Sequence, residues 1–261
     1  MNQPLNNVHP NAKIGKNVVI ESFVTISEDV AIDDGTWIGP NAVIMDGARI
    51  GKDCKIFPGA VISGIPQDLK FRGEKTTVEI GDSTTIREFC TVNRGTASKG
   101  KTVIGSDCLL QSYSHVAHDC FLKDHIILGS FAGLAGEVEA GDYAIISPYS
   151  AVHQFTRIGE HAFIAGGSLV RKDIPPYVLV ANEPLAYAGV NSVGLRRRGF
   201  SIEKINEIQE IYRYIFQKGL NISQALSLVE SEMGDTKERR VIVDFIRSSE
   251  RGIVRGGQEQ E

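Results

Sequence analysis

A six-residue repeat of aliphatic residues constrains this chain more than any other feature of its sequence. Every sixth residue from Val8 to Ile62 is Val or Ile, and the same phase returns over 80–92 and 104–170. A period of six fits neither an amphipathic helix nor a long strand, but it fits short strands that alternate with turns. Between residues 8 and 170, the positions in this phase that are not apolar are Asp68, Glu74 and Ser98.

Three such strands to a coil predict a parallel β-helix with a triangular cross-section and about 18 residues per coil. The aliphatic residues would fill the interior, and each is often followed by Gly, Asp or Glu, as in IGKN, IGPN, IGSD and IGEH. The pattern resembles that of left-handed hexapeptide β-helices, and the handedness is taken from that resemblance. The expected fold class is therefore mainly β, a left-handed parallel β-helix followed by a small C-terminal α-helical domain.

The sequence predicts two domains and a tail. Residues 1–190 are expected to form the β-helix, with loops near 63–79 and 93–103 that interrupt the repeat without shifting its phase. Residues 191–255 are expected to form the helical domain, because the hexapeptide pattern ends near Asp173-Ile-Pro-Pro-Tyr177. The Gly- and Glu-containing tail, 256–261, is expected to be disordered.

Three helices are expected after the β-helix. Ser201 can cap a helix whose apolar residues, from Ile205 to Phe216, recur at helical spacing, and Gly219 would close it. Two further helices are expected at 223–233 and 235–248. Asp235 would open the last of them, with Glu238 three residues later.

Composition excludes several classes of protein. A net charge of -4 argues against general nucleic-acid binding, which requires a basic surface. No stretch is long and apolar enough to span a bilayer, and the first ten residues do not form a targeting signal. We therefore expect a cytoplasmic protein without a transmembrane segment.

The four cysteines share one position in the repeat, and no two of them form a Cys-x-x-Cys pair. Each lies four residues after an inward-facing aliphatic residue, where a second small inward-facing residue is needed. Buried thiols in apolar surroundings are not activated as nucleophiles, so all four are expected to be reduced core residues. These are Cys54, Cys90, Cys108 and Cys120.

The segment HVAHDC at residues 115–120 carries the strongest chemical signal. His118 and Asp119 follow the inward-facing Val116 by two and three positions, which places them at an outward corner and predicts that both are accessible. His118 would stack one coil below Gly136 and two below Gln154. A histidine supported by a carboxylate, beneath an unobstructed glycine amide, suggests general-base catalysis of hydroxyl attack on a carbonyl.

The segment is also compatible with two other interpretations. The residues could be solvated corner positions without a function. They could also bind zinc, since β-helical carbonic anhydrases share the architecture, but a third ligand is needed and His153 and His161 are expected on different corners. Acyl transfer is favoured over a metal site, and neither a metal nor another cofactor is expected.

Several segments together resemble the acyl-carrier-protein-dependent UDP-N-acetylglucosamine O-acyltransferases, which begin lipid A synthesis. The resemblance covers nearly the whole chain. It implies a homotrimer with active sites in the grooves between adjacent prisms, a 3-hydroxyacyl carrier protein as donor and UDP-N-acetylglucosamine as acceptor. The segments are PQDLK at 66–70 with RGE at 72–74, NRGT at 93–96, HVAHDC at 115–120, AVHQF at 151–155, PPY at 175–177, GVN at 189–191 and LRRRGF at 195–200.

The resemblance also assigns roles to individual residues. It makes His118 the general base for the sugar 3-hydroxyl, Asp119 its support and Gly136 the amide donor to the oxyanion. It places Gly166 at the end of the acyl groove, contributed by an adjacent subunit. Expected substrate-binding residues are Gln67, Asp68, Lys70, His115, His153, Gln154, Asn191, Arg197 and Arg198.

Some features leave the substrate open. Arginines at 196–198 could meet a diphosphate or the acidic carrier protein. Glu137 and Val193 stand where many members have His and Glu, so a modified amino sugar is possible. N-acyl transfer to a 3-amino glucosamine derivative is the enzymatic alternative, although such enzymes usually carry an N-terminal domain that is not expected here. A scaffolding β-helix is the alternative without catalysis.

Overall fold

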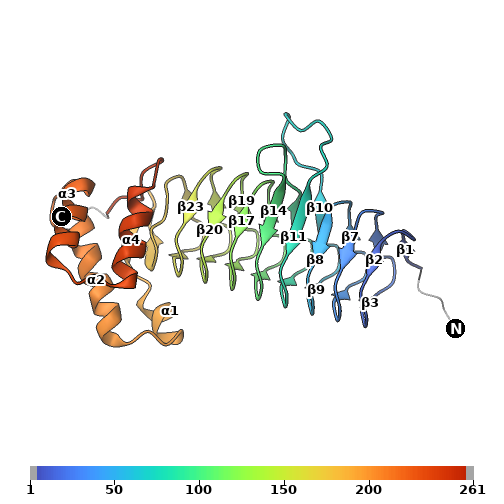
Figure 1. Cartoon of the computed structure of the whole chain (residues 1–261), viewed down its shortest axis with the longest axis horizontal. Coiled ribbons are helices and arrows are strands. Elements are labelled where there is room, and N and C mark those ends of the chain that lie inside the picture. Colours follow the sequence, from blue (N-terminus) through green and yellow to red (C-terminus); the bar gives the residue numbers. More distant parts are fainter. Residues whose placement is uncertain (1–4, 257–261) are drawn as a thin grey trace.

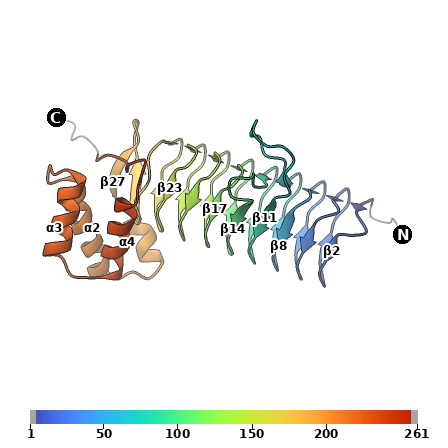
Figure 2. The same ribbon diagram turned by 45° about the horizontal axis from the view of Figure 1, so that its top comes forward.

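The inward-facing aliphatic residues stack directly on one another from coil to coil. Ile26 pairs with Ile44, and Ile44 with Ile62, in parallel register three hexapeptides apart. The computed structural model describes residues 5–256, and in that part the strands form three sheets that wind into one long prism (Figures 1 and 2). This confirms the expected left-handed parallel β-helix followed by a small helical domain.

Each sheet contains every third strand of the β-helix. We name the three sheets first, second and third, in the order in which β1, β2 and β3 begin them. The first sheet contains β1 (Asn7–Val8), β4 (Thr25–Ile26), β7 (Val43–Ile44), β10 (Val61–Gly64), β13 (Thr91–Asn93), β16 (His115–Val116), β19 (Gly133–Leu134), β22 (Ala151–Val152) and β25 (Leu169–Val170). The second contains β2 (Lys13–Ile14), β5 (Ala31–Ile32), β8 (Ala48–Ile50), β11 (Thr77–Ile80), β14 (Lys101–Ile104), β17 (Phe121–Leu122), β20 (Glu139–Ala140) and β23 (Arg157–Ile158).

The third sheet ends in a hairpin that the repeat does not predict. It contains β3 (Val19–Ile20), β6 (Trp37–Ile38), β9 (Lys55–Ile56), β12 (Thr85–Ile86), β15 (Leu109–Leu110), β18 (Ile127–Leu128), β21 (Ile145–Ile146), β24 (Phe163–Ile164), β26 (Val178–Ala181) and β27 (Ala186–Val190). β26 continues the parallel order, whereas β27 returns antiparallel to it. The hairpin therefore ends the stack of coils.

The turns between the sheets form three corners, which we also name in chain order. The first corner joins the first sheet to the second, the second corner joins the second sheet to the third, and the third corner joins the third sheet to the first. At most of these turns the third residue after the buried aliphatic residue has a positive φ, as in Asn41 and Asp107. Asn and Asp tolerate this left-handed conformation better than most residues, which explains part of the corner composition.

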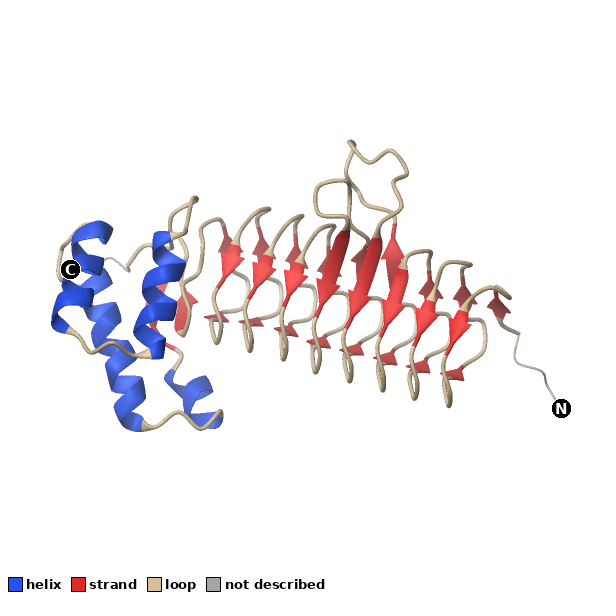
Figure 3. Ribbon diagram, in the orientation of Figure 1, coloured by secondary structure: helices blue, strands red, loops and turns tan. Residues whose placement is uncertain are grey.

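Both interruptions of the repeat are loops at the first corner (Figure 3). They cover residues 65–76 and 94–100, which is shorter than the expected ranges because β10, β11, β13 and β14 extend into them. The phase survives each loop, since Ile62 pairs with Val92 and Ile80 with Ile104. Two chain segments are therefore presented on the same edge of the prism.

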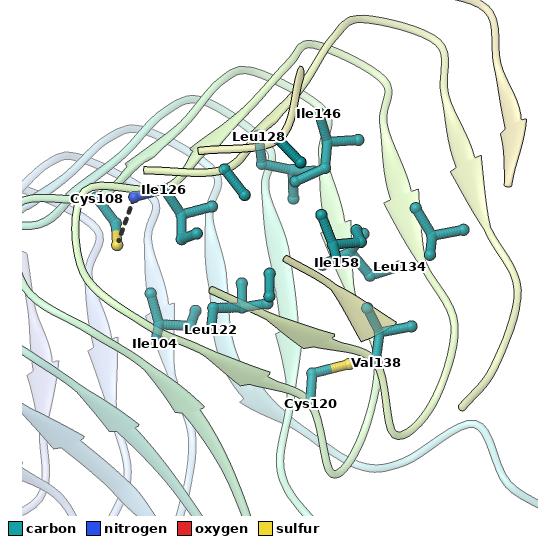
Figure 4. Close-up of a cluster of buried hydrophobic side chains, with 14 of the residues drawn as sticks. Ile104, Cys108, Cys120, Leu122, Ile126, Leu128, Leu134, Val138, Ile146 and Ile158 are labelled. Carbon is teal, nitrogen blue, oxygen red and sulfur yellow. Dashed lines mark hydrogen bonds between the residues drawn. The ribbon is translucent and has the colours of Figure 1, made fainter. Parts of the chain in front are cut away.

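The interior is continuous and apolar. Ile38, Ile86 and Leu110 are 0% exposed, and all four cysteines are buried without forming disulfides. Figure 4 shows Cys108 and Cys120 among Leu122, Ile126 and Val138. The positions of the cysteines confirm that they are core residues.

Within residues 5–256, four helices follow the hairpin: α1 (Ser192–Arg197), α2 (Ile202–Phe216), α3 (Ile222–Glu232) and α4 (Lys237–Arg247). Ser201 caps α2 as predicted. The capping residue of α4 lies one position later than predicted, because Thr236, and not Asp235, accepts the hydrogen bond from the Arg239 N–H. The short helix α1, capped by Asn191, was not predicted.

At the C-terminus, Gly256 forms a parallel bridge with Tyr187, so it is not part of a disordered tail. The rest of that predicted tail, 257–261, lies outside the described residues. Among residues 5–256, no helix is both long enough and apolar enough to cross a membrane.

The buried thiols lead to a prediction about reactivity. Burial raises the pKa of Cys54 and of Cys108 to about 11, and that of Cys120 to about 12. Because the thiolate is the reactive form, the native protein at pH 8 should react with a thiol reagent only as fast as it unfolds. A spectrophotometric titration should find all four thiols in denaturant, and rapid reaction of any thiol in the native protein would contradict the prediction.

Candidate functional site

The candidate site lies at the first corner, directly after β16. His118 Nδ1 is 2.8 Å from Asp119 Oδ2, and the His118 side chain is 18% exposed. Its Nε2 makes no hydrogen bond to any residue in 5–256. A hydrogen atom on Nδ1 that is donated to the carboxylate leaves the Nε2 lone pair free to accept a proton.

Asp119 is not accessible as the repeat predicted; it is 0% exposed. The prediction was wrong because the neighbouring loop 94–100 folds over this corner residue and binds its carboxylate. Its carboxylate accepts hydrogen bonds from the Thr96 N–H at 2.9 Å, the Thr96 hydroxyl at 2.7 Å and the Lys99 N–H at 3.2 Å. Asp119 therefore supports His118 from inside the protein.

The environment of Asp119 favours its ionised form. Burial alone would raise the pKa of this carboxyl, but hydrogen bonds from Thr96 and His118 outweigh burial and hold the pKa below its ordinary value. An ionised carboxylate can only accept hydrogen bonds. The pair is therefore arranged to keep a hydrogen atom on Nδ1 of His118.

Gly136 lies one coil above His118, as predicted. A Cβ atom at Gly136 would be 2.5 Å from Cε1 and 2.6 Å from Nε2 of His118, so the ring occupies the space of a side chain. Phe155 donates its N–H to the Gly136 carbonyl, while no acceptor within residues 5–256 is found for the Gly136 N–H. A free amide beside Nε2 can donate to an oxyanion that forms there.

Three other predicted residues lie along the same edge. His115 faces outward from the first sheet, with Nδ1 2.7 Å from the Thr91 hydroxyl, and its pKa is lowered by burial and then by nearby His118. His153 and Gln154 are exposed two coils above the HVAHDC segment. A guanidinium nitrogen of Arg251 lies 3.3 Å from His153 Nδ1.

The loop residues Gln67, Asp68 and Lys70 lie at the first corner below His118. Gln67 and Lys70 are exposed, and Asp68 accepts a hydrogen bond from the Lys70 N–H at 2.9 Å. Asp68 therefore shapes the loop as well as presenting a carboxylate.

The remaining predicted residues lie on other corners of the same chain. The Arg198 guanidinium is 5.0 Å from the centre of the Tyr143 ring at the second corner, and Arg197 is exposed nearby on α1. Gly166 is exposed at the third corner, so it is not in the column of His118. One chain alone does not bring these residues to the imidazole.

Asn191 also has a structural role. It is only 4% exposed, its Oδ1 caps α1 at Gly194 N–H, and its Nδ2 donates to the His161 carbonyl at 2.9 Å. The amide of Asn191 is therefore engaged within the chain, and its contact with the nucleotide stays a prediction.

Sequence reasoning missed the role of Thr96 and Lys99. Thr96 belongs to the NRGT segment that resembles the family. It lies in a loop that interrupts the repeat, so the six-residue spacing does not predict its contact with Asp119. Glu137, one coil above Asp119, accepts a hydrogen bond from Ser98 of the same loop at 3.0 Å. The described residues contain no group of three or more His, Cys, Asp or Glu residues that could hold a metal ion.

The sequence matches two family models. Residues 173–254 match UDP N-acetylglucosamine O-acyltransferase domain 2, and residues 29–64 match the bacterial transferase hexapeptide of six repeats. An acyl-[acyl-carrier-protein]–UDP-N-acetylglucosamine O-acyltransferase of Burkholderia mallei (strain SAVP1) is 43% identical over 201 residues, covering 75% of this chain and 77% of the relative. One of the same name from Stenotrophomonas maltophilia (strain K279a) is 42% identical over 198 residues, covering 75% of each.

Solved structures of UDP-N-acetylglucosamine acyltransferases are also similar to this chain over nearly its whole length. A UDP-N-acetylglucosamine acyltransferase from Bacteroides fragilis 9343 superposes with a TM-score of 0.96 at 52% identity, covering 98% of this chain and 100% of that one. The enzyme from Francisella novicida superposes with a TM-score of 0.95 at 39% identity, covering 98% and 94%.

The contact between Gly136 and His118 leads to a prediction. Replacing Gly136 with Ala should displace the imidazole, because no side chain fits at less than 3 Å from the ring. Gly133→Ala is the matched control, since a Cβ at Gly133 would meet nothing within 4 Å. The ¹⁵N and ¹H NMR signals of the His118 ring should change in Gly136→Ala alone, and unchanged signals in that variant would refute the packing described here.

Proposed function

Because this chain belongs to the family of acyl-[acyl-carrier-protein]–UDP-N-acetylglucosamine O-acyltransferases, we propose that His118 and Asp119 perform the chemistry of that family. The enzyme transfers an acyl chain from acyl carrier protein to UDP-N-acetylglucosamine. In this proposal the chain is an R-3-hydroxyacyl group, the acceptor is the sugar 3-hydroxyl, and the product enters lipid A biosynthesis in the cytoplasm.

The observation that carries the proposal is the free Nε2 of an imidazole whose Nδ1 is held by a buried carboxylate. Nε2 would remove the proton from the sugar hydroxyl as its oxygen attacks the thioester carbonyl. The Gly136 N–H would donate to the oxyanion of the tetrahedral intermediate. As that intermediate collapses, the C–S bond breaks and His118 returns the proton to the departing carrier thiolate.

Substrate contacts are proposed for polar residues around the first corner. Gln67, Asp68 and Lys70 would reach the sugar nucleotide from the exposed loop below His118. His115, His153 and Gln154 line the edge beside and above it.

A homotrimer would bring the remaining residues to this site. Outward-facing residues of the second sheet form ion pairs, Lys101 with Glu79 at 2.9 Å and Arg157 with Glu139 at 3.6 Å. The outward face of the third sheet is instead apolar along its upper coils, at Leu109, Ile127, Ile145 and Phe163, which are half-buried in the single chain. We propose that this apolar face packs against the first sheet of a neighbouring copy.

The third corner supports the same assembly. It carries a column of stacked rings, Phe89, Tyr113, Phe131 and Tyr149, each about half exposed or more. If three such corners meet at the axis, the outer first corner of one prism faces the second corner of the next. Arg197 and Arg198 of the neighbour would then approach the nucleotide diphosphate.

Gly166 would end the acyl groove in this arrangement. The turn at this corner requires a positive φ at Gly167, 71°, and not at Gly166. A Cβ at Gly166 would closely approach only the Pro148 carbonyl oxygen, at 3.3 Å, so the chain itself does not require glycine there. A side chain at 166 would therefore point into the space proposed for the acyl chain, roughly 13 Å along the prism from His118 at about 4.8 Å per coil.

The activity itself is tested by mass measurement of the product. We expect an acylated product from UDP-N-acetylglucosamine and a long-chain 3-hydroxyacyl carrier protein, without added metal. A product formed only from a 3-amino derivative of the sugar would favour N-acyl transfer, and no product with either sugar would favour a scaffold.

His118→Ala should lower kcat by about 10²–10⁴-fold with little change in KM, since a general base acts mainly in the transition state. His9→Ala is the matched control, because His9 is also a partly exposed histidine at the first corner but follows β1, five coils below His118. Near-normal turnover by folded His118→Ala protein would remove His118 from its proposed role.

Gly166→Met should depress activity on long acyl chains and spare activity on chains several carbons shorter. An equal loss of activity on acyl chains of all lengths would show that Gly166 does not form the end of the acyl groove.

Mixing Gly166→Met chains with His118→Ala chains tests whether Gly166 acts on a neighbour. Exchanged trimers would contain sites that combine an intact His118 with an intact Gly166, so activity on long chains should return. No recovery, in mixtures shown by native mass spectrometry to have exchanged subunits, would place both residues of a site in one chain.

A further inference from the structure

We infer that Thr96 is a positioning residue for the general base: its hydroxyl and backbone amide fix the Asp119 carboxylate and thereby select the His118 tautomer that can accept a proton. This inference rests on the proposed role of His118. It concerns a residue on a loop that leaves the prism, and not a residue of the six-residue repeat.

Thr96 contacts both oxygens of the carboxylate. Its N–H donates to Asp119 Oδ1 at 2.9 Å, and its hydroxyl is 2.7 Å from Oδ2. The same Oδ2 is 2.8 Å from His118 Nδ1. Thr96 is 7% exposed and Asp119 0% exposed, so water does not compete freely for these bonds. The carboxylate is therefore held in one orientation at the imidazole.

The direction of these hydrogen bonds follows from the donors around Thr96. A hydroxyl can donate or accept a hydrogen bond. Here the Ser98 N–H donates to Thr96 Oγ1 at 3.1 Å, so the hydroxyl oxygen already acts as an acceptor for Ser98. The hydroxyl hydrogen is then directed to Asp119 Oδ2. With this donor in place Oδ2 stays ionised and accepts from Nδ1, which leaves the His118 Nε2 without a hydrogen atom.

The loop is itself held in place around Thr96. The Thr76 hydroxyl donates to the Gly95 carbonyl at 2.6 Å, and the Gly100 N–H donates to the Thr96 carbonyl at 2.8 Å. Ser98 is bound to Glu137 in the coil above. These hydrogen bonds fix loop 94–100 against the prism, so that it can support Asp119.

Removing the hydroxyl should make Asp119 easier to protonate. The hydrogen bond from Thr96 is one of the contacts that lower the pKa of Asp119 against the effect of burial. A protonated Asp119 would donate to Nδ1, which would move the imidazole hydrogen to Nε2 and abolish the base. The other titratable groups around Asp119 are His118, His115, Lys99, Cys120 and Glu137.

The sign of the pH effect follows from these contacts. A carboxyl whose pKa is lowered loses its ionised form only as the pH falls through that lowered pKa. Raising the pKa of Asp119 therefore moves the loss of activity to higher pH. Because Asp119 and His118 share a hydrogen bond, the acid limb of the kcat profile belongs to the pair.

The experiment compares Thr96→Val, which keeps the shape and the backbone amide, with Thr96→Ser, which keeps the hydroxyl. Thr96→Val should lower kcat at pH 7 by about ten- to a hundredfold, as expected for a lost hydrogen bond to a charged group. Its KM should be unchanged, and the acid limb of its kcat profile should shift to higher pH. Thr96→Ser should behave as the unmodified enzyme, and Thr96→Ala repeats the test if Thr96→Val does not fold.

Thr84→Val is the control for loss of a buried threonine hydroxyl. Thr84 is 0% exposed, and its hydroxyl donates to the Gly105 carbonyl at another corner. This variant should lose thermal stability without a shift of the pH profile. An unshifted profile in Thr96→Val, or equal losses in Thr96→Ser and Thr96→Val, would overturn the positioning role.

A second readout separates this inference from the proposed function. The ¹⁵N shifts of the His118 ring, followed from pH 5 to 8, report the tautomer without any substrate. Thr96→Val should show hydrogen on Nε2 over a wider pH range than the unmodified protein, and identical tautomers would reject the inference. Normal turnover by His118→Ala would instead reject His118 as the base, whatever the tautomer result.

Discussion

The interior stack of aliphatic side chains is the constraint on which the rest of this structure depends. Each fully buried Ile, Val or Leu contributes about 1.5–3 kcal/mol, and each stacks on its equivalents in the coils above and below. A shift of one residue would turn these side chains outward, so the register is strongly fixed. Every corner is then placed by its distance along the chain from the nearest buried aliphatic residue.

The candidate site uses this fixed register in two ways. Stacking holds the His118 ring beneath Gly136, where the absence of a side chain makes room for it. Loop 94–100, which interrupts the repeat before β14, provides hydrogen-bond donors to Asp119 that a regular coil would not provide. A regular coil at this corner would leave the carboxylate exposed to water, where it would be a weaker support for the imidazole.

The second and third sheets of the prism differ in the polarity of their outward-facing side chains. Ion pairs on the second sheet are suited to solvent, whereas the apolar upper coils of the third sheet and the ring column of the third corner are suited to contact with another copy. In the proposed trimer, this division would place Arg198 and Gly166 of neighbouring copies near the His118 of another copy.

The sequence by itself determined the β-helix, the burial of the four cysteines, the capping of α2 by Ser201 and the column of His118 and Gly136. All of these follow from fixed spacing or from a local capping pattern, which short-range periodicity encodes. The tertiary structure alone decided the burial of Asp119 by Thr96, the structural use of Asn191 and the antiparallel return of β27. Each of these depends on a contact between segments that no repeat relates, such as a loop folding back over a corner, and periodicity carries no information about such contacts.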